Sequence, residues 1–313
     1  MAKRRKNVAS SRNKPQGKRP LVTLLIVAVL IVAAFFILEK VRRSSVSPPV
    51  PEKPAVKEHH KMPERTAKED VEHQPYTTAI PLPPKHPRKR ATGPGTVAII
   101  IDDMGSSVRE VKDLMAIKIP LTFAIIPGLA HVKGVAEAAH AGGYQVMIHI
   151  PMEPKGYPQQ RMERYGLLLS QSEEEIRKRL DGFVREVPYA RGANNHMGSR
   201  FTEERGKMET VLGFLKGKGL FFIDSKTTPR SVGNSLAREM GIENASRNVF
   251  LDNEQDVEAI REQLEQLAEM ARRKGAAIGI CHPHKATIQA LATTMPELQK
   301  SGITFVSAED LVR

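Results

Sequence analysis

The last two thirds of the chain alternate short apolar, β-branched runs with segments of helical character. Eight runs have the length and composition of strands, at residues 96–101, 121–126, 145–150, 192–195, 220–223, 248–251, 277–280 and 303–306. Between them, Ser172 and Glu175 form a capping box for a helix that reaches about Arg185. Apolar residues from Val257 to Ala271 recur at three- and four-residue spacing, which predicts a second long helix.

This alternation predicts a parallel sheet, because each helical crossover returns the chain to start the next strand in the same direction. Seven or eight strand–helix units in about 218 residues favour a single closed or nearly closed α/β barrel. A doubly wound open sheet is the alternative.

Polar residues with metal-binding or acid–base chemistry follow several of the predicted strands. In a parallel sheet the carboxyl ends of the strands border one crevice, where ligands bind. The sequence therefore predicts a metal-assisted active site built from residues at the ends of five runs: Asp102, Asp103, His149, His196, Asp224, His282 and His284.

The paired carboxylates of Asp102 and Asp103 follow three isoleucines. One can ligate a divalent metal ion while its neighbour accepts a proton from the attacking water. The alternative is that one of them caps a helix starting near Ser106. His149 lies inside an apolar run, which suits either a metal ligand or a core histidine bonded to the backbone.

His196 is a candidate third ligand, and Glu153, four residues after His149, is another. Asn195, or the backbone at residues 198–199, can donate to a developing oxyanion, although this segment also has the composition of a turn.

Asp224 ends the fifth run, where it can orient a catalytic histidine, bind substrate or cap a loop. Either His282 or His284 can act as the general acid that protonates a leaving group. A three-ligand site of oxygen and nitrogen atoms with an open position is typical of catalytic Zn²⁺, and manganese, iron or cobalt also fits. Cys281 is not expected to be a nucleophile, because apolar neighbours raise the pKa of a thiol.

The N-terminal third differs sharply from the rest. Residues 1–20 carry eight Lys or Arg and no acidic residue, and residues 21–38 contain no charge. As a helix, residues 21–38 would be roughly 27 Å long, close to the thickness of the hydrocarbon core. The positive-inside bias predicts a cytoplasmic N-terminus, a single-pass anchor at 21–38 and an exported C-terminal domain, with a cleaved signal peptide as the alternative. Residues 44–95 hold 11 of the 22 prolines and are predicted to form a disordered linker.

The net charge of +13 does not indicate nucleic-acid binding. Residues 1–95 carry 20 basic against 7 acidic residues, whereas residues 96–313 carry 28 of each. The predicted folded domain therefore has no basic excess for phosphate contacts, and the chain has no Trp for base stacking.

The segments IIIDDMG (99–105), MIHIPM (147–152), NNHMGS (194–199), FIDS (222–225) and GICHPH (279–284) together resemble the divergent polysaccharide deacetylase family. The resemblance implies a distorted (β/α) barrel of about seven strands over residues 96–313. It also implies a metal-dependent hydrolase of N- or O-acetylated glycans. Because the predicted anchor and linker would place the domain at the outer face of the membrane, a glycan of the cell envelope is the expected substrate.

The same resemblance implies roles for individual residues. Asp102 corresponds to the base and Asp103 to a metal ligand, and His282 or His284 corresponds to the general acid. The wider deacetylases place a second histidine four residues after the one matched by His149, where this chain has Glu153; His196 is the preferred substitute. A non-catalytic glycan-binding or envelope-assembly protein, and a metal-dependent phosphoesterase, are the alternative functions.

Overall fold

The structure is a computed structural model that describes residues 94–313. Its strands are β1 (Gly95–Met104), β2 (Thr122–Ile125), β3 (Gln145–Met152), β4 (Ala190–Met197), β5 (Phe221–Asp224), β6 (Asn244–Ser246), β7 (Val249–Phe250), β8 (Ala276–Cys281) and β9 (Ile303–Val306). Its helices are α2 (Val108–Met115), α3 (Val132–Ala141), α4 (Glu173–Glu186), α5 (Arg205–Gly217), α6 (Gly233–Glu239), α7 (Val257–Lys274) and α8 (Lys285–Lys300), with 3₁₀ turns η1 (Phe201–Glu203) and η2 (Ala308–Leu311). None of the helices within 94–313 meets the length and hydropathy needed to cross a bilayer. The predicted anchor at 21–38 and most of the predicted linker lie outside the described residues.

All strand pairs are parallel, and the strands lie in the order β6-β5-β4-β3-β2-β1-β8-β7, with β9 beside β1. This consecutive order matches a barrel and differs from the doubly wound sheet that was the alternative. The two edge strands, β6 and β7, are joined by residues 247–248 alone, so the sheet curls until its edges meet without pairing. The predicted distorted barrel is therefore confirmed in its strand order, with nine strands rather than about seven within 94–313.

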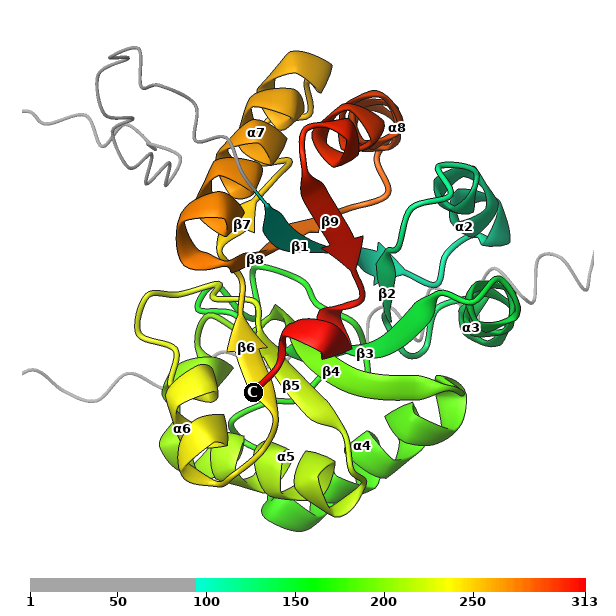
Figure 1. Cartoon of the computed structure of the whole chain (residues 1–313). Helices are drawn as coiled ribbons and strands as arrows, with labels where there is room; N and C mark the ends of the chain where they lie inside the picture. Colours follow the sequence, from blue (N-terminus) through cyan, green and yellow to red (C-terminus); the bar gives the residue numbers. More distant parts are fainter. Residues whose placement is uncertain (1–93) are drawn as a thin grey trace, which may run out of the picture. The chain divides into compact units, whose positions relative to one another are not determined.

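Side chains alternate between the two faces of the sheet, as the two-residue period of a strand requires. Ile99 and Ile101 join the larger core, which the helices cover, whereas Ala98 and Ile100 join a smaller core on the concave face. Figure 1 shows the helices around the outside of the curved sheet. The smaller core includes Ala308 of η2, so the end of the chain helps to fill the inside of the barrel.

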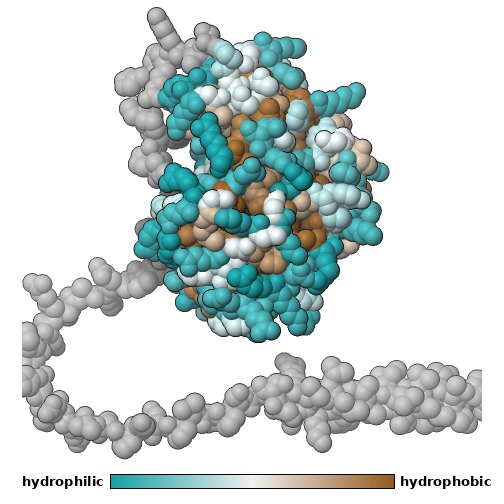
Figure 2. Space-filling model, turned by 60° about the horizontal axis from the view of Figure 1, so that its bottom comes forward, coloured by the Kyte–Doolittle hydropathy of each residue, from teal (hydrophilic) through white to brown (hydrophobic). Residues whose placement is uncertain are grey.

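Several local predictions are confirmed. Ser172 caps α4 in a full capping box with Glu175, and the apolar stripe of α7 is buried. Helix α2 is capped by Ser107, whose side chain accepts from the Arg109 amide, so neither aspartate serves as a cap. One strand was missed: the three residues of β6 carry no apolar run that would predict them. In the view of Figure 2, hydrophilic residues cover most of the domain surface and hydrophobic ones show mainly towards its middle.

Candidate active site at the carboxyl ends of the strands

The two aspartates lie within β1, at a kink that turns both towards one crevice. The pairing of β1 with β2 shifts register between Ile101 and Met104, and Asp103 has a φ of +57°. A regular strand would send neighbouring side chains to opposite faces, but a bulge with a left-handed residue redirects one of them. As a result, Asp102 Oδ2 and Asp103 Oδ1 lie 3.4 and 3.2 Å from the same atom, His149 Nε2. We expected both to face the crevice just past the strand end; the kink achieves this inside the strand.

Three predicted metal ligands meet at this crevice. His149 is on β3 and His196 is on β4, the next two strands beyond β2. His196 Nδ1 lies 2.8 Å from Asp103 Oδ1 and 3.2 Å from His149 Nε2. One ligand atom from each of the three residues therefore lies within 4.8 Å of the other two, which is close enough to share one ion.

The chemistry of these atoms fits a divalent cation. Asp103 Oδ1 is buried and has no hydrogen bond of good geometry, although His196 Nδ1 and His149 Nε2 lie only 2.8 and 3.2 Å from it. Buried polar atoms are nearly always paired, so an unpaired carboxylate oxygen facing two imidazoles indicates a missing partner. A carboxylate and two histidines are a common ligand set for Zn²⁺ and other first-row metals, which leaves further positions for water or substrate.

Asn194 fixes the orientation of His149. Asn194 Oδ1 lies 2.7 Å from His149 Nδ1, and a carbonyl oxygen can only accept, so this ring nitrogen carries the hydrogen. In the neutral ring the opposite nitrogen, Nε2, carries no hydrogen and turns its lone pair towards Asp103, which is the form that binds a metal ion. Asn194 Nδ2 donates to Asp102 Oδ1 at 2.8 Å, so one buried amide holds both a metal-ligand candidate and the base candidate.

Burial and charge set the ionisation of the aspartates in opposite ways. Burial raises the pKa of Asp102, which is 3% exposed. Burial would also raise the pKa of Asp103, but the imidazoles of His149 and His196 outweigh it and hold this pKa well below its usual range. Burial opposes the charged form of His149, and the charges of Asp102 and Asp103 reverse that effect and raise its pKa to about 9.

His282, at the end of β8, is held by Asp252. His282 Nδ1 lies 3.1 Å from Asp252 Oδ1, and the His282 amide donates to Asp252 Oδ2 at 2.7 Å. Thr287 of α8 also donates to Oδ2, at 2.9 Å. The other ring nitrogen, His282 Nε2, lies 3.7 Å from Asp103 Oδ2. His282 therefore has the arrangement of an oriented acid–base histidine beside the metal-ligand cluster.

His284 is placed less favourably. It is the N-cap residue of α8, and its ring centroid lies 5.6 Å from that of His282. Asp252, His282 and His284 also offer atoms within 4.8 Å of one another. Both oxygens of Asp252, however, already accept hydrogen bonds from protein groups. Of the two predicted general acids, the geometry favours His282.

Asp224 is not the residue that orients this histidine. Its carboxylate accepts from the amides of Lys226 and Asn234 and from Ser231 Oγ, at 2.8–3.1 Å. These bonds shape the loop between β5 and α6, so of the predicted roles the loop cap describes it best. Asp252, which was not predicted, holds His282 instead.

The side chain of Asn195 is also fully used in hydrogen bonds to neighbouring protein groups. Its amide nitrogen donates to Met197 O at 2.8 Å and approaches Thr227 Oγ1 at 3.4 Å, and its oxygen accepts from the Ser225 amide. Both amide hydrogens are used, so the structure does not support the expected donation to an oxyanion.

Glu153 and Cys281 take no part in the chemistry. Glu153 is buried, where it accepts from the Leu169 amide and pairs with Arg200 at 2.8 Å, so it is not the third ligand. Cys281 is buried, and burial raises the pKa of its thiol well above the usual value, as expected for a residue that is not a nucleophile.

The crevice holds a hollow of about 310 Å³. Asp102, His149, His196 and His282 line it, together with residues of the surrounding loops. Arg247, in the link between β6 and β7, is another lining residue: its guanidinium donates to the carbonyls of Ser225 and Lys226 and lies 5.0 Å from the Phe250 ring centroid. The hollow thus has acid–base groups on its floor and a cation and an aromatic ring in its wall.

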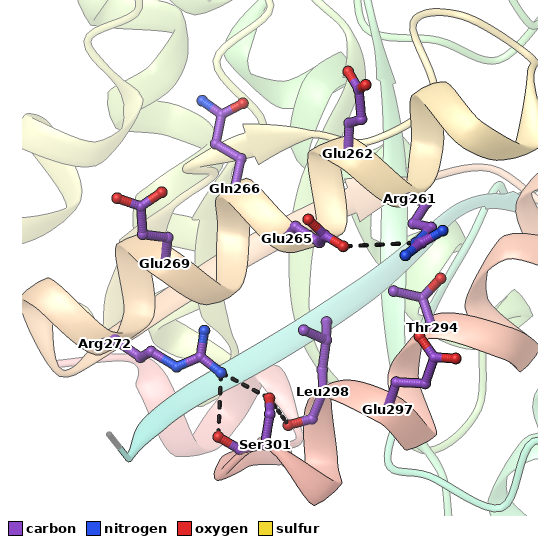
Figure 3. A pocket seen from close by; sticks show the side chains of 10 residues that line it. All are labelled: Arg261, Glu262, Glu265, Gln266, Glu269, Arg272, Thr294, Glu297, Leu298 and Ser301. Atoms are coloured by element: carbon purple, nitrogen blue, oxygen red, sulfur yellow. Dashed lines mark hydrogen bonds and ion pairs between the residues drawn. The ribbon is translucent and has the colours of Figure 1, made fainter. Parts of the chain in front are cut away.

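A larger hollow of about 450 Å³ lies between α7 and α8, but it contains none of these residues (Figure 3). Its side chains are four glutamates, two arginines and four others on the two helices. Figure 3 shows Arg261 paired with Glu265 and Arg272 bonded to Ser301. Such pairs are ordinary on solvated helix surfaces, and the strand-end hollow is the candidate active site.

Sequence reasoning missed Asp252 and Glu163. Asp252 follows a predicted strand and could have been found by the rule that identified Asp224. Glu163 lies in the loop after β3; its Oε2 is buried without a hydrogen-bond partner, 3.5 Å from the equally unpartnered His196 Nε2. No local pattern marks this glutamate, because only the fold of a long loop brings it to His196.

Comparisons with known proteins give a matching family and two relatives. The family described as divergent polysaccharide deacetylase matches residues 99–312. The uncharacterized protein YibQ of Escherichia coli (strain K12) is 35% identical over 218 residues, which cover 70% of this chain and 67% of that protein. An uncharacterized protein of Haemophilus influenzae is 33% identical over 202 residues, which cover 64% of this chain and 71% of that protein.

A solved structure has the same fold. The crystal structure of the uncharacterized protein ATU2773 from Agrobacterium tumefaciens C58 superposes with a TM-score of 0.67 at 26% identity. The match covers 72% of this chain and 92% of that one. It therefore includes nearly all of the described domain.

Proposed function

Because the chain belongs to the divergent polysaccharide deacetylase family, we propose that it is a metal-dependent hydrolase that removes acetyl groups from a cell-envelope polysaccharide. One observation carries the proposal. Asp103 Oδ1, His149 Nε2 and His196 Nδ1 converge, and the buried carboxylate oxygen among them has no hydrogen-bond partner. This cluster lies beside a second carboxylate and a carboxylate-bound histidine, which a hydrolase needs for proton transfer.

Asp103, His149 and His196 would hold the ion, and this ligand set suits Zn²⁺. When bound, such an ion polarises an ester or amide carbonyl and lowers the pKa of water. Asn194 keeps the lone pair of His149 directed at the site, and Glu163 stands where it can accept a hydrogen from the far nitrogen of His196.

Asp102 accepts the proton of the attacking water. It faces the same crevice as Asp103, and the amide of Asn194 holds one of its oxygens. The second oxygen is directed at the ligand cluster, where a water would be activated. Because Asp102 and the ligand Asp103 are adjacent on β1, the base is already beside the ligand cluster and does not have to move to reach the water.

His282 donates a proton to the departing amine or alcohol. Asp252 holds its Nδ1 and stabilises the protonated ring, and Nε2 faces the hollow. The acid and the base therefore approach the reacting group from different strands, β8 and β1.

The missing second histidine motivated the non-catalytic alternative. His196 now offers a third ligand atom from a different strand, while Glu153 is occupied in the scaffold. This arrangement favours an active site over a binding protein on an inactive barrel.

The test is metal analysis of the purified chain, followed by acetate release from acetylated glucosamine polymers and from acetylated neutral polysaccharides. We expect one tightly bound divalent ion and acetate release that Asp102→Asn abolishes. A chain that binds no ion at these ligands, or a metal-loaded chain that releases no acetate from either class, would overturn the proposal.

We also propose that residues 21–38 anchor the chain, with the C-terminal domain outside the cytoplasmic membrane, where an envelope polysaccharide is accessible. The support is the sequence alone: 18 uncharged residues preceded by eight basic ones. The chain should stay in the membrane fraction after alkaline extraction, and protease added outside spheroplasts should degrade its C-terminal domain. Recovery in the soluble cytoplasmic fraction contradicts the proposal.

A further inference from the structure

The loop between β3 and α4, residues 153–172, both borders the hollow and approaches a proposed metal ligand. Pro154 and Gln160 line the hollow, and Glu163 lies 3.5 Å from His196. Buried Glu153 anchors one end of the loop. The loop also pairs with the end of β3, where the Leu167 amide donates to Pro151 O. The backbone of the loop is therefore anchored beside the site.

Tyr165 is at the tip of this loop. The amide of Gly166 donates to Glu163 O at 2.9 Å, which makes a turn with Arg164 and Tyr165 at its centre. Tyr165 is 52% exposed, and only one other large hydrophobic side chain among residues 94–313, that of Tyr189, is also exposed. An aromatic ring left in water beside a site is a common mark of a binding surface.

The backbone of Gly128 lies against the ring of Tyr165. A Cβ added to Gly128 would lie 3.3 Å from ring atom Cδ2, so the glycine backbone forms a close base for the ring. Gly128 has a φ of +84°, a conformation that favours glycine, and its amide is fixed by Glu186. The Arg164 guanidinium lies 5.8 Å from the ring centroid. By contrast, the ring of Tyr189 is stacked on His140, with centroids 3.9 Å apart.

The size of the hollow indicates what Tyr165 would contact. A volume of about 310 Å³ is at the lower end for ligand pockets, enough for one acetylated sugar ring but not for a polymer. The neighbouring rings of a bound polysaccharide must then lie over the rim. Tyr165 is the second residue after Glu163, so their Cα atoms are at most about 7 Å apart and the tyrosine is within the range of an adjacent ring.

We propose that Tyr165, supported by Gly128, is an aromatic subsite that stacks on the apolar face of the sugar ring next to the one being deacetylated. This inference rests on the proposed function and specifies its substrate class: a glycan of at least two rings, rather than an isolated acetylated monosaccharide. Stacking gives affinity without reading individual hydroxyls, which suits a repetitive polymer.

The experiment compares Tyr165→Ala with Tyr189→Ala in the full-length chain carrying Asp102→Asn, which blocks turnover. Tyr189 is a matched control, because it is similarly exposed but precedes the first residue of β4, at the amino end of the strands. Binding of N-acetylglucosamine and of its β-1,4-linked tetramer is measured by calorimetry or by ligand-observed NMR.

We expect the tetramer to bind more tightly than the monosaccharide, and Tyr165→Ala to weaken tetramer binding about three- to tenfold without changing monosaccharide binding. Tyr165→Phe, which keeps the ring, should restore the affinity, and Tyr189→Ala should have no effect. Equal affinities for tetramer and monosaccharide in the parent, or equal tetramer binding by the Tyr165→Ala and Tyr189→Ala variants, would overturn the subsite. Because binding is read without turnover, this failure is distinct from absent acetate release, which overturns the proposed function.

Discussion

The two Asp–His–His clusters at the mouth of the barrel have the same composition but opposite states of hydrogen bonding. In the first, Asp103 Oδ1 faces two imidazoles and accepts no hydrogen bond. In the second, both oxygens of Asp252 accept hydrogen bonds from His282 and Thr287. Spacing alone would assign a metal to either cluster.

The difference shows that the number of candidate ligands does not distinguish a metal site from a proton-transfer dyad. The distinguishing feature is whether the carboxylate oxygens already accept hydrogen bonds from the protein. A carboxylate whose lone pairs are already used gains little from an ion, whereas a buried, unpaired oxygen gains a great deal. On this basis the Asp103 cluster would hold the ion and the Asp252 cluster would hold the acid. Variants that disturb one cluster at a time separate these two roles.

Asp103→Asn should break the first cluster. The amide removes a negative charge from the ligand set, so we expect the bound ion to be lost and acetate release to fall by about 10³-fold or more. Metal content by mass spectrometry and initial rates of acetate release measure the two effects. Asn tolerates the left-handed conformation of this residue, so circular dichroism should show an unchanged fold. A variant with full metal content would show that Asp103 is not a ligand.

His282→Gln should break the second cluster and leave the first intact. Loss of a general acid lowers kcat by roughly 10²- to 10⁴-fold, while the metal content should stay at the parent value. The matched change His284→Gln should lower kcat far less, because His284 does not line the hollow and His282 does. Equal losses for the two variants, or loss of the ion from His282→Gln, would contradict the division between the clusters.

Glu163→Gln should weaken the metal-ligand cluster without removing a ligand. Removing the carboxylate beside His196 Nε2 should lower the metal affinity about 10- to 100-fold, because such partners fix the ring and raise its basicity. A competition titration with a chelating dye measures this affinity. Glu153→Gln, in the same loop, is the control: it should lower the free energy of unfolding by roughly 1–3 kcal/mol and leave metal affinity unchanged. Unchanged affinity in Glu163→Gln would remove the proposed role.

The smallest effect is expected on stability, from Glu203, which lies outside both clusters. Hydrogen bonds from Lys155, Thr228 and Arg230 lower its pKa to about 2. A group with a depressed folded-state pKa stabilises the fold above its unfolded-state value and loses that contribution as the pH falls. Glu203→Gln should therefore lower the urea midpoint at pH 7, and the difference from the parent should shrink between about pH 4.5 and 2. A difference that is independent of pH would show that the charge contributes nothing.

Much of the fold could be predicted from the sequence, because strands buried on both faces of a parallel sheet consist of continuous apolar runs. The three isoleucines of β1 and the runs of β3 and β8 are of this kind, and the capping box at Ser172 marks its helix directly. β6 was missed because Asn244, Ala245 and Ser246 form no apolar run and become a strand only by pairing with β5. Such pairing is a property of the assembled sheet and leaves no local signal.

The site divides in the same way. Strand-end residues such as His149 and His196 could be predicted, since topology fixes where a strand ends. The choice between Asp224 and Asp252 could not, because both follow predicted strands, and only three-dimensional packing shows which carboxylate touches His282. Glu153 misled because its distance from His149 along the chain matches a family motif, although its side chain turns into the scaffold.

The kink in β1 has a consequence for how this segment can vary. Two adjacent carboxylates share one crevice only because Asp103 adopts a left-handed backbone conformation. Inserting one residue between Asp102 and Asp103 would turn one of the two carboxylates away from the crevice, whatever the chemistry of the neighbours. Changes of length should therefore be tolerated less well here than changes of an exposed residue. A library that randomises the exposed Ser106 at constant length should retain more folded members than one that inserts a single glycine between Asp102 and Asp103.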